Sequence, residues 1–205
     1  MDEEPRLPLR QKQALETRRS IAEAARSLFL SNGYGATSIE AIAARAGVAA
    51  STIYAVFRTK RAILREIRAP WHEASRIREV AYASPLLDMD PAERLRRLAH
   101  ATRRQWETGS EVVTIYRSAA AIDTEAAAEL DAALRGRRAA LEAFAEGLRS
   151  SLRPGLSVER AAALLRSLCL AEVYEELVGS SGWSPDEYEE WLAGALAREL
   201  LPEQG

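Results

Sequence analysis

TSIEAIAARAGVAASTIYAVF, residues 37–57, contains two short amphipathic helical patterns that meet at a glycine. Thr37 and Glu40 have the spacing of a capping box, so we expect a helix that starts at residue 38 and ends at Gly47, where the chain turns sharply. Residues 51–57 form a second helical pattern with Ile53 and Phe57 on its apolar side. Two short helices joined by a glycine turn predict a helix-turn-helix unit.

An amphipathic segment over about residues 15–30 precedes this unit and ends at Ser31-Asn32-Gly33, a typical helix terminus. We expect it to support the two short helices. Residues 1–12 contain two prolines and no apolar periodicity, which predicts a flexible tail. Arg6, Arg10 and Lys12 of this tail are candidates to contact DNA, although a solvated tail is the simpler interpretation.

The composition of the 205-residue chain predicts an all-α fold. Apolar residues make up 47% and charged residues 28%, which is ordinary for a folded protein, and β-branched residues never alternate over the length of a strand. No apolar run approaches the roughly 20 residues that span a bilayer. The first residues are acidic, whereas a signal peptide starts with basic residues that are followed by apolar ones. We therefore expect a cytoplasmic protein without a membrane partner.

The charge is distributed unevenly along the chain. Residues 1–65 hold eleven Arg and Lys and six Asp and Glu, whereas the rest holds seventeen and twenty-four. A basic N-terminal head on an acidic body suits contact with nucleic acid, because neutralised phosphates supply most non-specific affinity. Solvated helix faces produce similar asymmetries, so this signal is weak by itself.

The rest of the chain offers no site for catalysis or metal binding. Cys169 lies in an apolar stretch and is expected to be a buried small hydrophobe, with redox sensing as the alternative. His72 and His100 lack the partners that a helical metal site needs. Phosphate loops, dinucleotide fingerprints and nucleophile elbows are missing from the sequence. We expect neither an enzyme nor a bound cofactor.

The N-terminal part of the sequence resembles the TetR (tetracycline-repressor-like) family of regulators. The resemblance covers about residues 13–65 and is carried by a motif several dozen residues long. Its members are Ile21-Ala22-Glu23-Ala24-Ala25, Leu28-Phe29, Gly33-Tyr34, Thr37, Ile42-Ala43, Ala46-Gly47-Val48, Thr52-Ile53-Tyr54, Phe57 and Lys60.

The resemblance implies roles for several residues of the head. Thr37 would cap a helix and meet a phosphate, Thr52 would face the bases with Ser51 beside it, and Tyr54 and Lys60 would contact phosphates. The sequence departs from the family pattern in three places, so base recognition would rest on few polar side chains. The departures are Ala49, Ala50 and Val56.

Further helical patterns fill the body. One begins at Lys60 behind Thr59, is kinked at Pro70 and resumes as far as residue 82. Later patterns cover 90–108, which Gly109 ends, then 112–119, 124–150, 157–178 and 185–200. The sequence thus divides into a tail (1–12), a helix-turn-helix domain (13–59) and a helical effector-binding and dimerisation domain (60–205).

The last two helices carry wide apolar stripes, and the resemblance implies a homodimer through them. The alternative is packing within one chain. The expected interface residues are Leu165, Leu168, Val173, Leu177, Tyr188, Trp191, Leu192 and Leu196.

The resemblance also implies a small-molecule pocket among the middle helices, although an aromatic residue at helical spacing is more often part of the core. Candidate pocket residues are Trp71, Thr102, Trp106, Tyr116 and Phe144, and Gln105, Thr114 and Ser118 could add polar contacts.

These observations lead to one hypothesis and one alternative. The hypothesis is a ligand-responsive repressor that binds a palindromic double-stranded DNA operator as a homodimer and is released by a small molecule of unknown identity. The alternative is an all-helical enzyme or protein-interaction module that retains a helix-turn-helix head.

Overall fold

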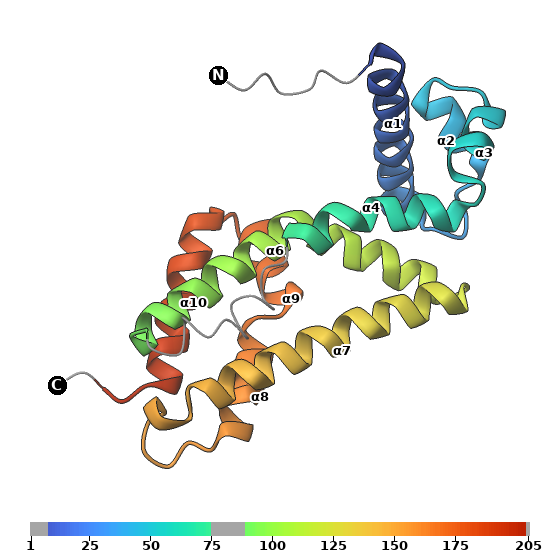
Figure 1. Ribbon diagram of the computed structural model, residues 1–205. Coiled ribbons are helices and arrows are strands. Elements are labelled where there is room, and N and C mark those ends of the chain that lie inside the picture. Colours follow the sequence, from blue (N-terminus) through green and yellow to red (C-terminus); the bar gives the residue numbers. More distant parts are fainter. Residues whose placement is uncertain (1–7, 75–88, 204–205) are drawn as a thin grey trace. The chain divides into compact units, whose positions relative to one another are not determined.

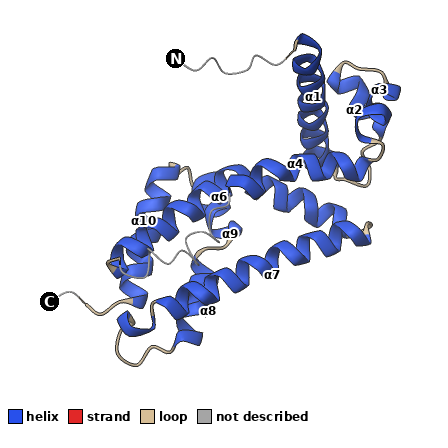
Figure 2. Ribbon diagram, in the orientation of Figure 1, coloured by secondary structure: helices blue, strands red, loops and turns tan. Residues whose placement is uncertain are grey.

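The computed structural model describes residues 8–74 and 89–203, and every regular element in these ranges is a helix (Figures 1 and 2). The predicted all-α fold is confirmed for this part of the chain. The α-helices are α1 (Leu9–Asn32), α2 (Ile39–Ala46), α3 (Ala50–Phe57), α4 (Lys60–Ala74), α6 (Pro91–Ala120), α7 (Thr124–Gly147), α8 (Val158–Leu168), α9 (Ala171–Tyr174) and α10 (Pro185–Leu200). A 3₁₀ turn (Arg149–Ser151) follows α7, and a π-helical stretch (Glu175–Ser180) follows α9.

The contacts group the chain into two compact units that are not contiguous in sequence. Unit 1 consists of residues 1–70 and 111–128, and unit 2 consists of residues 71–110 and 129–205. Helices α4 and α6 each contribute residues to both units. The head predicted from residues 13–59 therefore shares its unit with the end of α6 and the start of α7.

Unit 1 is built around the inward faces of its first helices. Ile21, Ala25 and Phe29 of α1 are almost completely buried, as are Ile42 of α2 and Ile53 of α3. These residues recur at the three- and four-residue spacing that places apolar side chains on one helix face. The predicted supporting helix and both short helices are thus present.

Helix α1 begins earlier than predicted, at Leu9, inside the segment interpreted as a flexible tail. Pro8 immediately precedes it, in an extended conformation with φ −53° and ψ 143°. The residues that follow, Arg10-Gln11-Lys12-Gln13-Ala14-Leu15-Glu16, are strong helix formers, so intrinsic propensity extends the helix without a buried face. The absence of apolar periodicity concealed this part of the helix.

Helix α6 runs without interruption through Gly109, where the sequence predicted the end of one helix and the start of another. A Cβ atom at Gly109 would lie 1.9 Å from Cδ1 of Trp71. Because both residues belong to unit 2, this glycine allows α4 and α6 to approach closely. Gly109 therefore serves packing and does not end the helix.

The single helix predicted over 157–178 is broken at Cys169 and Leu170. Leu170 has extended backbone angles, φ −68° and ψ 152°, between α8 and α9. The Cys169 carbonyl accepts a hydrogen bond from Trp106 Nε1 at 3.1 Å and another from the Arg137 guanidinium. These two donors satisfy a backbone oxygen that the break removes from the helical ladder.

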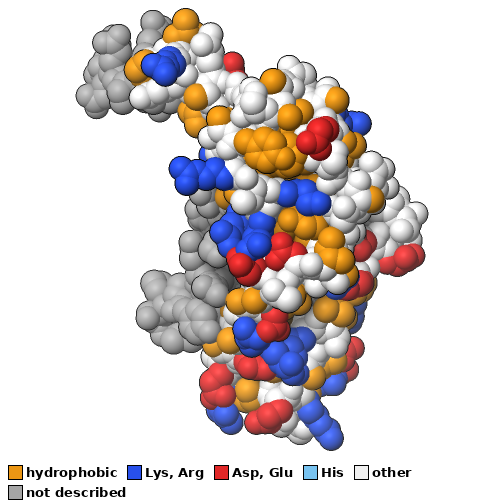
Figure 3. Space-filling view, turned by 90° about the vertical axis from the view of Figure 1, so that its right-hand side faces the viewer, with side chains coloured by type: hydrophobic (Ala, Val, Ile, Leu, Met, Phe, Trp, Pro, Cys, Tyr) orange, Lys and Arg blue, Asp and Glu red, His pale blue; other side chains and the backbone are white. Residues whose placement is uncertain are grey.

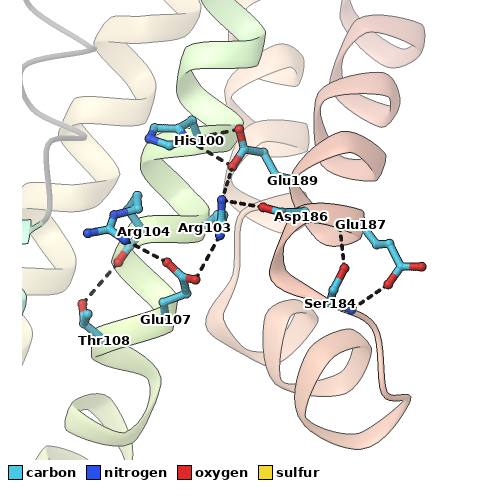
Figure 4. A network of polar contacts seen from close by, with 9 residues as sticks. All are labelled: His100, Arg103, Arg104, Glu107, Thr108, Ser184, Asp186, Glu187 and Glu189. Atoms are coloured by element: carbon cyan, nitrogen blue, oxygen red, sulfur yellow. Dashed lines mark hydrogen bonds and ion pairs between the residues drawn. The ribbon is translucent and has the colours of Figure 1, made fainter.

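Helices α6 and α10 are joined by a network of polar contacts in unit 2 (Figure 4). The Arg103 guanidinium lies 2.9 Å from Asp186 and 3.2 Å from Glu189, and His100 Nδ1 lies 3.1 Å from the same Glu189 carboxylate. The network holds the Asp186 and Glu189 side of α10 against α6. The predicted start of α10 is confirmed, with Ser184 and Glu187 forming a reciprocal capping box.

We expect Gly109→Ala to destabilise the protein by about 1–3 kcal/mol, because the added methyl group overlaps the buried Trp71 ring. Gly179→Ala is the matched control, since a Cβ at Gly179 meets nothing within 4 Å. Chemical denaturation of both variants measures the difference. Equal midpoints for the two variants would contradict the close approach of α4 and α6.

Candidate nucleic-acid interface

Helices α2 and α3 meet at an angle of 105°, within the range that helix-turn-helix units adopt. Gly47 lies in the left-handed region with φ 69° and ψ 29°, and its N–H donates to the last carbonyls of α2. Only glycine adopts this conformation without a steric penalty, so the sharp turn depends on it. The helix-turn-helix predicted from the sequence is present.

One side of α3 is open to solvent, while Ile53 and Phe57 anchor the other side in the core. Ser51 and Tyr54 are exposed, Tyr54 to 50%, and Thr52 is half-buried. A helix fixed by a buried face and presenting hydroxyl groups on its open face can enter a major groove and offer donors and acceptors to base edges. Three of the five predicted DNA-contacting residues thus share one short helix.

Thr37 is not the cap of α2, which corrects the sequence-based expectation. The cap is Ser38, whose Oγ accepts a hydrogen bond from the Ala41 N–H at 3.1 Å. Thr37 is buried, and its hydroxyl donates to the Gly33 carbonyl at 2.9 Å, with the Leu28 carbonyl at 3.3 Å. Thr37 therefore fixes the loop before α2, and Ser38 is the hydroxyl at the exposed start of that helix.

Lys60 is engaged inside unit 1. Its Nζ donates to the carbonyls of Tyr34 at 2.7 Å and Thr37 at 3.0 Å, and it lies 4.3 Å from the centre of the Tyr34 ring. Burial lowers the pKa of this ammonium group from its usual value. Lys60 thus ties the start of α4 to the loop between α1 and α2.

Two exposed arginines of the head were not singled out from the sequence. The side chains of Arg45, in the last turn of α2, and Arg58, after α3, have no hydrogen-bond or ion-pair partner among the described residues. Arg58 also has a positive φ of 61°, and the following Thr59 N–H donates to Phe57 at 2.7 Å in a tight three-residue turn. A non-glycine residue held in this region stores strain, which often accompanies functional sites.

Several other arginines of unit 1 are paired with acids. Arg18 lies 2.6 Å from Glu66, and Arg61 lies 3.0 Å from Asp123. Over the lower part of the view in Figure 3, basic and acidic side chains likewise lie side by side. The unpaired Arg45 and Arg58 next to α3 therefore stand out as positive charge available to an anionic partner.

The end of α6 and the start of α7 brace the head from within unit 1. The Tyr34 N–H donates to Ser118 Oγ at 3.0 Å, and Asp123 accepts from Arg61 while capping the first N–H groups of α7. Ser118, weighed from the sequence as a pocket residue, instead binds this backbone amide.

Four of the eight predicted dimer residues lie inside the protomer. Leu165, Tyr188, Leu192 and Leu196 are fully buried in the single chain, so they form its core and not its surface. The alternative of packing within one chain holds for these four. Leu168, Val173, Leu177 and Trp191 are partly exposed and remain available to a second protomer.

The five predicted pocket residues are divided between the two units. Tyr116 belongs to unit 1, where the Arg68 guanidinium lies 5.8 Å from its ring centre. Trp71, Thr102, Trp106 and Phe144 belong to unit 2. Trp106 is engaged by the Cys169 carbonyl, and Phe144 is completely buried, so both contribute to the core.

Unit 2 contains buried polar atoms without a hydrogen-bond partner among the described residues. They include Trp71 Nε1 and Gln105 Oε1. An unpaired buried polar group costs about 1–3 kcal/mol, so such groups mark places where a ligand or water is expected. Cys169 is fully buried, as predicted, and burial raises the pKa of its thiol.

Within the described ranges, no three His, Cys, Asp or Glu side chains gather where they could hold a metal ion. No single helix of these ranges is long and apolar enough to cross a membrane. Helices α2 and α3 pass that composition test only when taken together across their bend.

Comparisons with known proteins give a family match for the head. Residues 21–67 match the family model described as "Bacterial regulatory proteins, tetR family". This segment contains α2, α3 and the start of α4, and it confirms the resemblance found in the sequence. No curated protein sequence matches the chain.

Several solved structures share the fold over most of the chain. The chain is similar to NalD of Pseudomonas aeruginosa, described as the secondary repressor of the MexAB-OprM multidrug efflux pump, with 24% identity, TM-score 0.64 and coverage of 94% of this chain and 100% of that one. KstR2 of Mycobacterium tuberculosis, a ketosteroid transcriptional regulator, has 21% identity, TM-score 0.68 and coverage of 91% and 95%. A SmeT–triclosan complex has 20% identity, TM-score 0.68 and coverage of 91% and 92%.

We expect Arg58→Gly to change stability and DNA binding in opposite directions. Glycine relieves the positive φ, so the free energy of unfolding should rise by about 1 kcal/mol. Loss of the unpaired charge should at the same time weaken binding to any duplex. Arg58→Lys, which keeps both charge and strain, is the control. Denaturant titrations and fluorescence anisotropy measure the two effects, and a less stable glycine variant would show that the turn is unstrained.

Proposed function

We propose that this chain, whose residues 21–67 match the tetR family of bacterial regulatory proteins and whose fold is that of TetR-family regulators, is a DNA-binding transcriptional repressor. It would bind an operator through α3 and respond to a small molecule held in unit 2. As a regulator of bacterial promoters it would work in the cytoplasm, and it would not be an enzyme.

The observation that carries this proposal is the geometry of α2, the Gly47 turn and α3. The 105° angle lets α3 project its open face, with Ser51, Thr52 and Tyr54, while Ile53 and Phe57 hold it in the core. The N-terminus of α2, capped by Ser38, would offer backbone N–H groups to a phosphate. Bases would be read by α3, and the phosphates beside it would fix its register.

A homodimer would present two copies of α3 to a near-palindromic operator, with half-sites one helical turn or a multiple apart. The partly exposed Leu168, Val173, Leu177 and Trp191 are the apolar residues available for such an interface. An open groove of about 320 Å³ lies on the same side of α10 as Trp191 and is lined also by Trp183 and Gly194. A partner helix would cover this surface.

The effector would bind in unit 2, where Trp71 Nε1 and Gln105 Oε1 are buried without a partner among the described residues. These groups are one donor and one acceptor, which suits an effector that carries a few polar groups on a largely apolar body. Trp71 lies on α4, the same helix that begins at Lys60. A ligand at Trp71 would therefore touch an element that reaches the head.

We expect Thr52→Ala and Lys60→Gln to affect DNA binding in different ways. The Thr52 variant should lose discrimination at one or two base pairs. The Lys60 variant should bind all sequences more weakly, with the salt slope lowered by about one unit per protomer, because it loses a charge that would neutralise a phosphate. Titration of the promoter DNA beside its own gene and of random DNA, at stated salt, measures both.

The matched control for this experiment is Lys60→Arg, which keeps the charge. Lys60→Gln also removes the hydrogen bonds to the Tyr34 and Thr37 carbonyls and should lower the stability of the protein. The DNA titrations of this variant are therefore carried out well below its melting temperature. Identical, sequence-blind losses in the Thr52 and Lys60 variants would refute the assignment of roles. Wild-type affinity for the promoter no better than for random DNA would refute the function itself.

The dimer proposal predicts different outcomes for two adjacent substitutions on α10. Trp191→Glu places a charge on the partly exposed stripe and should give a folded monomer. Leu192→Glu places one in the protomer's own core and should unfold the chain, because an unpaired buried charge costs several kcal/mol. Sedimentation and circular dichroism distinguish them. A folded, dimeric Trp191→Glu protein would locate the interface elsewhere.

A further inference from the structure

Residues 9–16 form the first two turns of α1, and the fold of unit 1 does not explain them. None of these residues is buried, whereas the buried residues of α1 begin at Ile21. The segment also lies upstream of the family-matched residues 21–67. A solvated helical extension of this length is costly to order, so a contact outside the protomer is worth seeking.

The extension runs beside the recognition helix α3. Gln13, Ala14, Leu15, Thr17 and Arg18 of α1 line an open groove of about 410 Å³ together with Val56 of α3. Within this unit α1 stands next to α2 and α3 in Figure 1. The first turns of α1 are therefore continuous with the proposed DNA-binding surface.

Helical geometry shows which flank of α3 faces the extension. Thr52 and Val56 are four residues apart and share one flank, while Tyr54, two residues from each, lies on the other flank. Since Val56 borders the groove, α1 lies on the Thr52 side. A recognition helix in a major groove about 12 Å wide has a phosphate wall on each side. Tyr54 faces one wall, and the extension faces the other.

One unpaired cation lies on the face of α1 that points toward α3. Arg10 is three, four and seven residues from Gln13, Ala14 and Thr17, all of which line the groove. Arg10 is exposed and has no hydrogen-bond or ion-pair partner among the described residues. Arg18, further along this face, is already bound to Glu66 and lies 4.6 Å from the Phe57 ring centre.

We propose that the extension of α1 is a second DNA-contacting surface, in which Arg10 binds the phosphate backbone on the Thr52 side of the recognition helix. This inference rests on the proposed function, because it needs α3 in the major groove. The guanidinium is suited to this role, since its fixed fork of donors matches phosphate oxygens. The contact would be independent of base sequence and would add affinity and register without specificity.

The helix supplies its own control. Lys12 is two residues from Arg10, about 200° around the helix, so it points away from α3. Like that of Arg10, its side chain is exposed and has no partner among the described residues. Arg10→Gln and Lys12→Gln each remove one positive charge from the same turns, and both replacements keep a good helix former. Only Arg10→Gln should remove a phosphate contact.

The experiment measures the affinity of the full-length wild type and both variants for two duplexes across a range of salt concentrations. One duplex is the promoter DNA beside the protein's own gene, and the other has random sequence. For a dimer, Arg10→Gln should lower the salt slope by about two units and weaken binding to both duplexes by roughly ten- to thirtyfold at physiological salt. Lys12→Gln should change affinity less than threefold, and Arg10→Lys should recover most of the loss.

Equal slopes for Arg10→Gln and wild type, or equal losses for Arg10→Gln and Lys12→Gln, would overturn the proposal. Circular dichroism and thermal melting confirm that the compared variants are folded. The outcome is separable from the proposed function. If the wild type does not prefer the promoter, the repressor proposal fails while the slopes on random DNA are still informative. If it does prefer the promoter and the slopes are equal, only the Arg10 contact fails.

Discussion

The ammonium group of Lys60 donates to the backbone carbonyls of Tyr34 and Thr37 and lies over the Tyr34 ring, and the arrangement of the head depends on this contact. It ties the first residue of α4 to the loop that leads into α2. The same loop is held by the Thr37 hydroxyl on the Gly33 carbonyl and by Ser118 on the Tyr34 N–H. With the loop fixed, the Ser38 cap and the Gly47 turn determine where α3 points.

The close approach of α4 and α6 at Gly109 is the second constraint on the structure. The missing Cβ at Gly109 lets α6 pass the Trp71 ring without a break, so a single helix supplies residues to both units. Unit 2 satisfies its own irregular backbone with side chains, as Trp106 and Arg137 do for Cys169. Polar atoms without a hydrogen-bond partner in the described part of the chain, such as Gln105 Oε1, are then exceptions in an otherwise satisfied interior. They are therefore the more informative guide to an effector site.

Local patterns in the sequence were enough to predict the helices of the head, and the predictions that failed did so for physical reasons. The turn at Gly47 and the buried faces of α2 and α3 follow from spacing alone. Thr37 and Ser38 are adjacent hydroxyl residues, and only burial of the first reveals that the second is the cap. Gly109 resembles a helix terminator until Trp71 is seen against it. Likewise, an apolar stripe does not show whether Leu192 faces its own core or a partner, and here it faces the core.

The central claim is that the head places α3 in the major groove of a specific operator, twice in each complex. Hydroxyl-radical footprinting on the promoter DNA beside the protein's own gene tests this most directly, because it maps each protected sugar along both strands. We expect two symmetry-related protected half-sites whose centres are about 10 base pairs or a multiple apart. Uniform protection at all positions, or a single unpaired site at saturating protein, would contradict it.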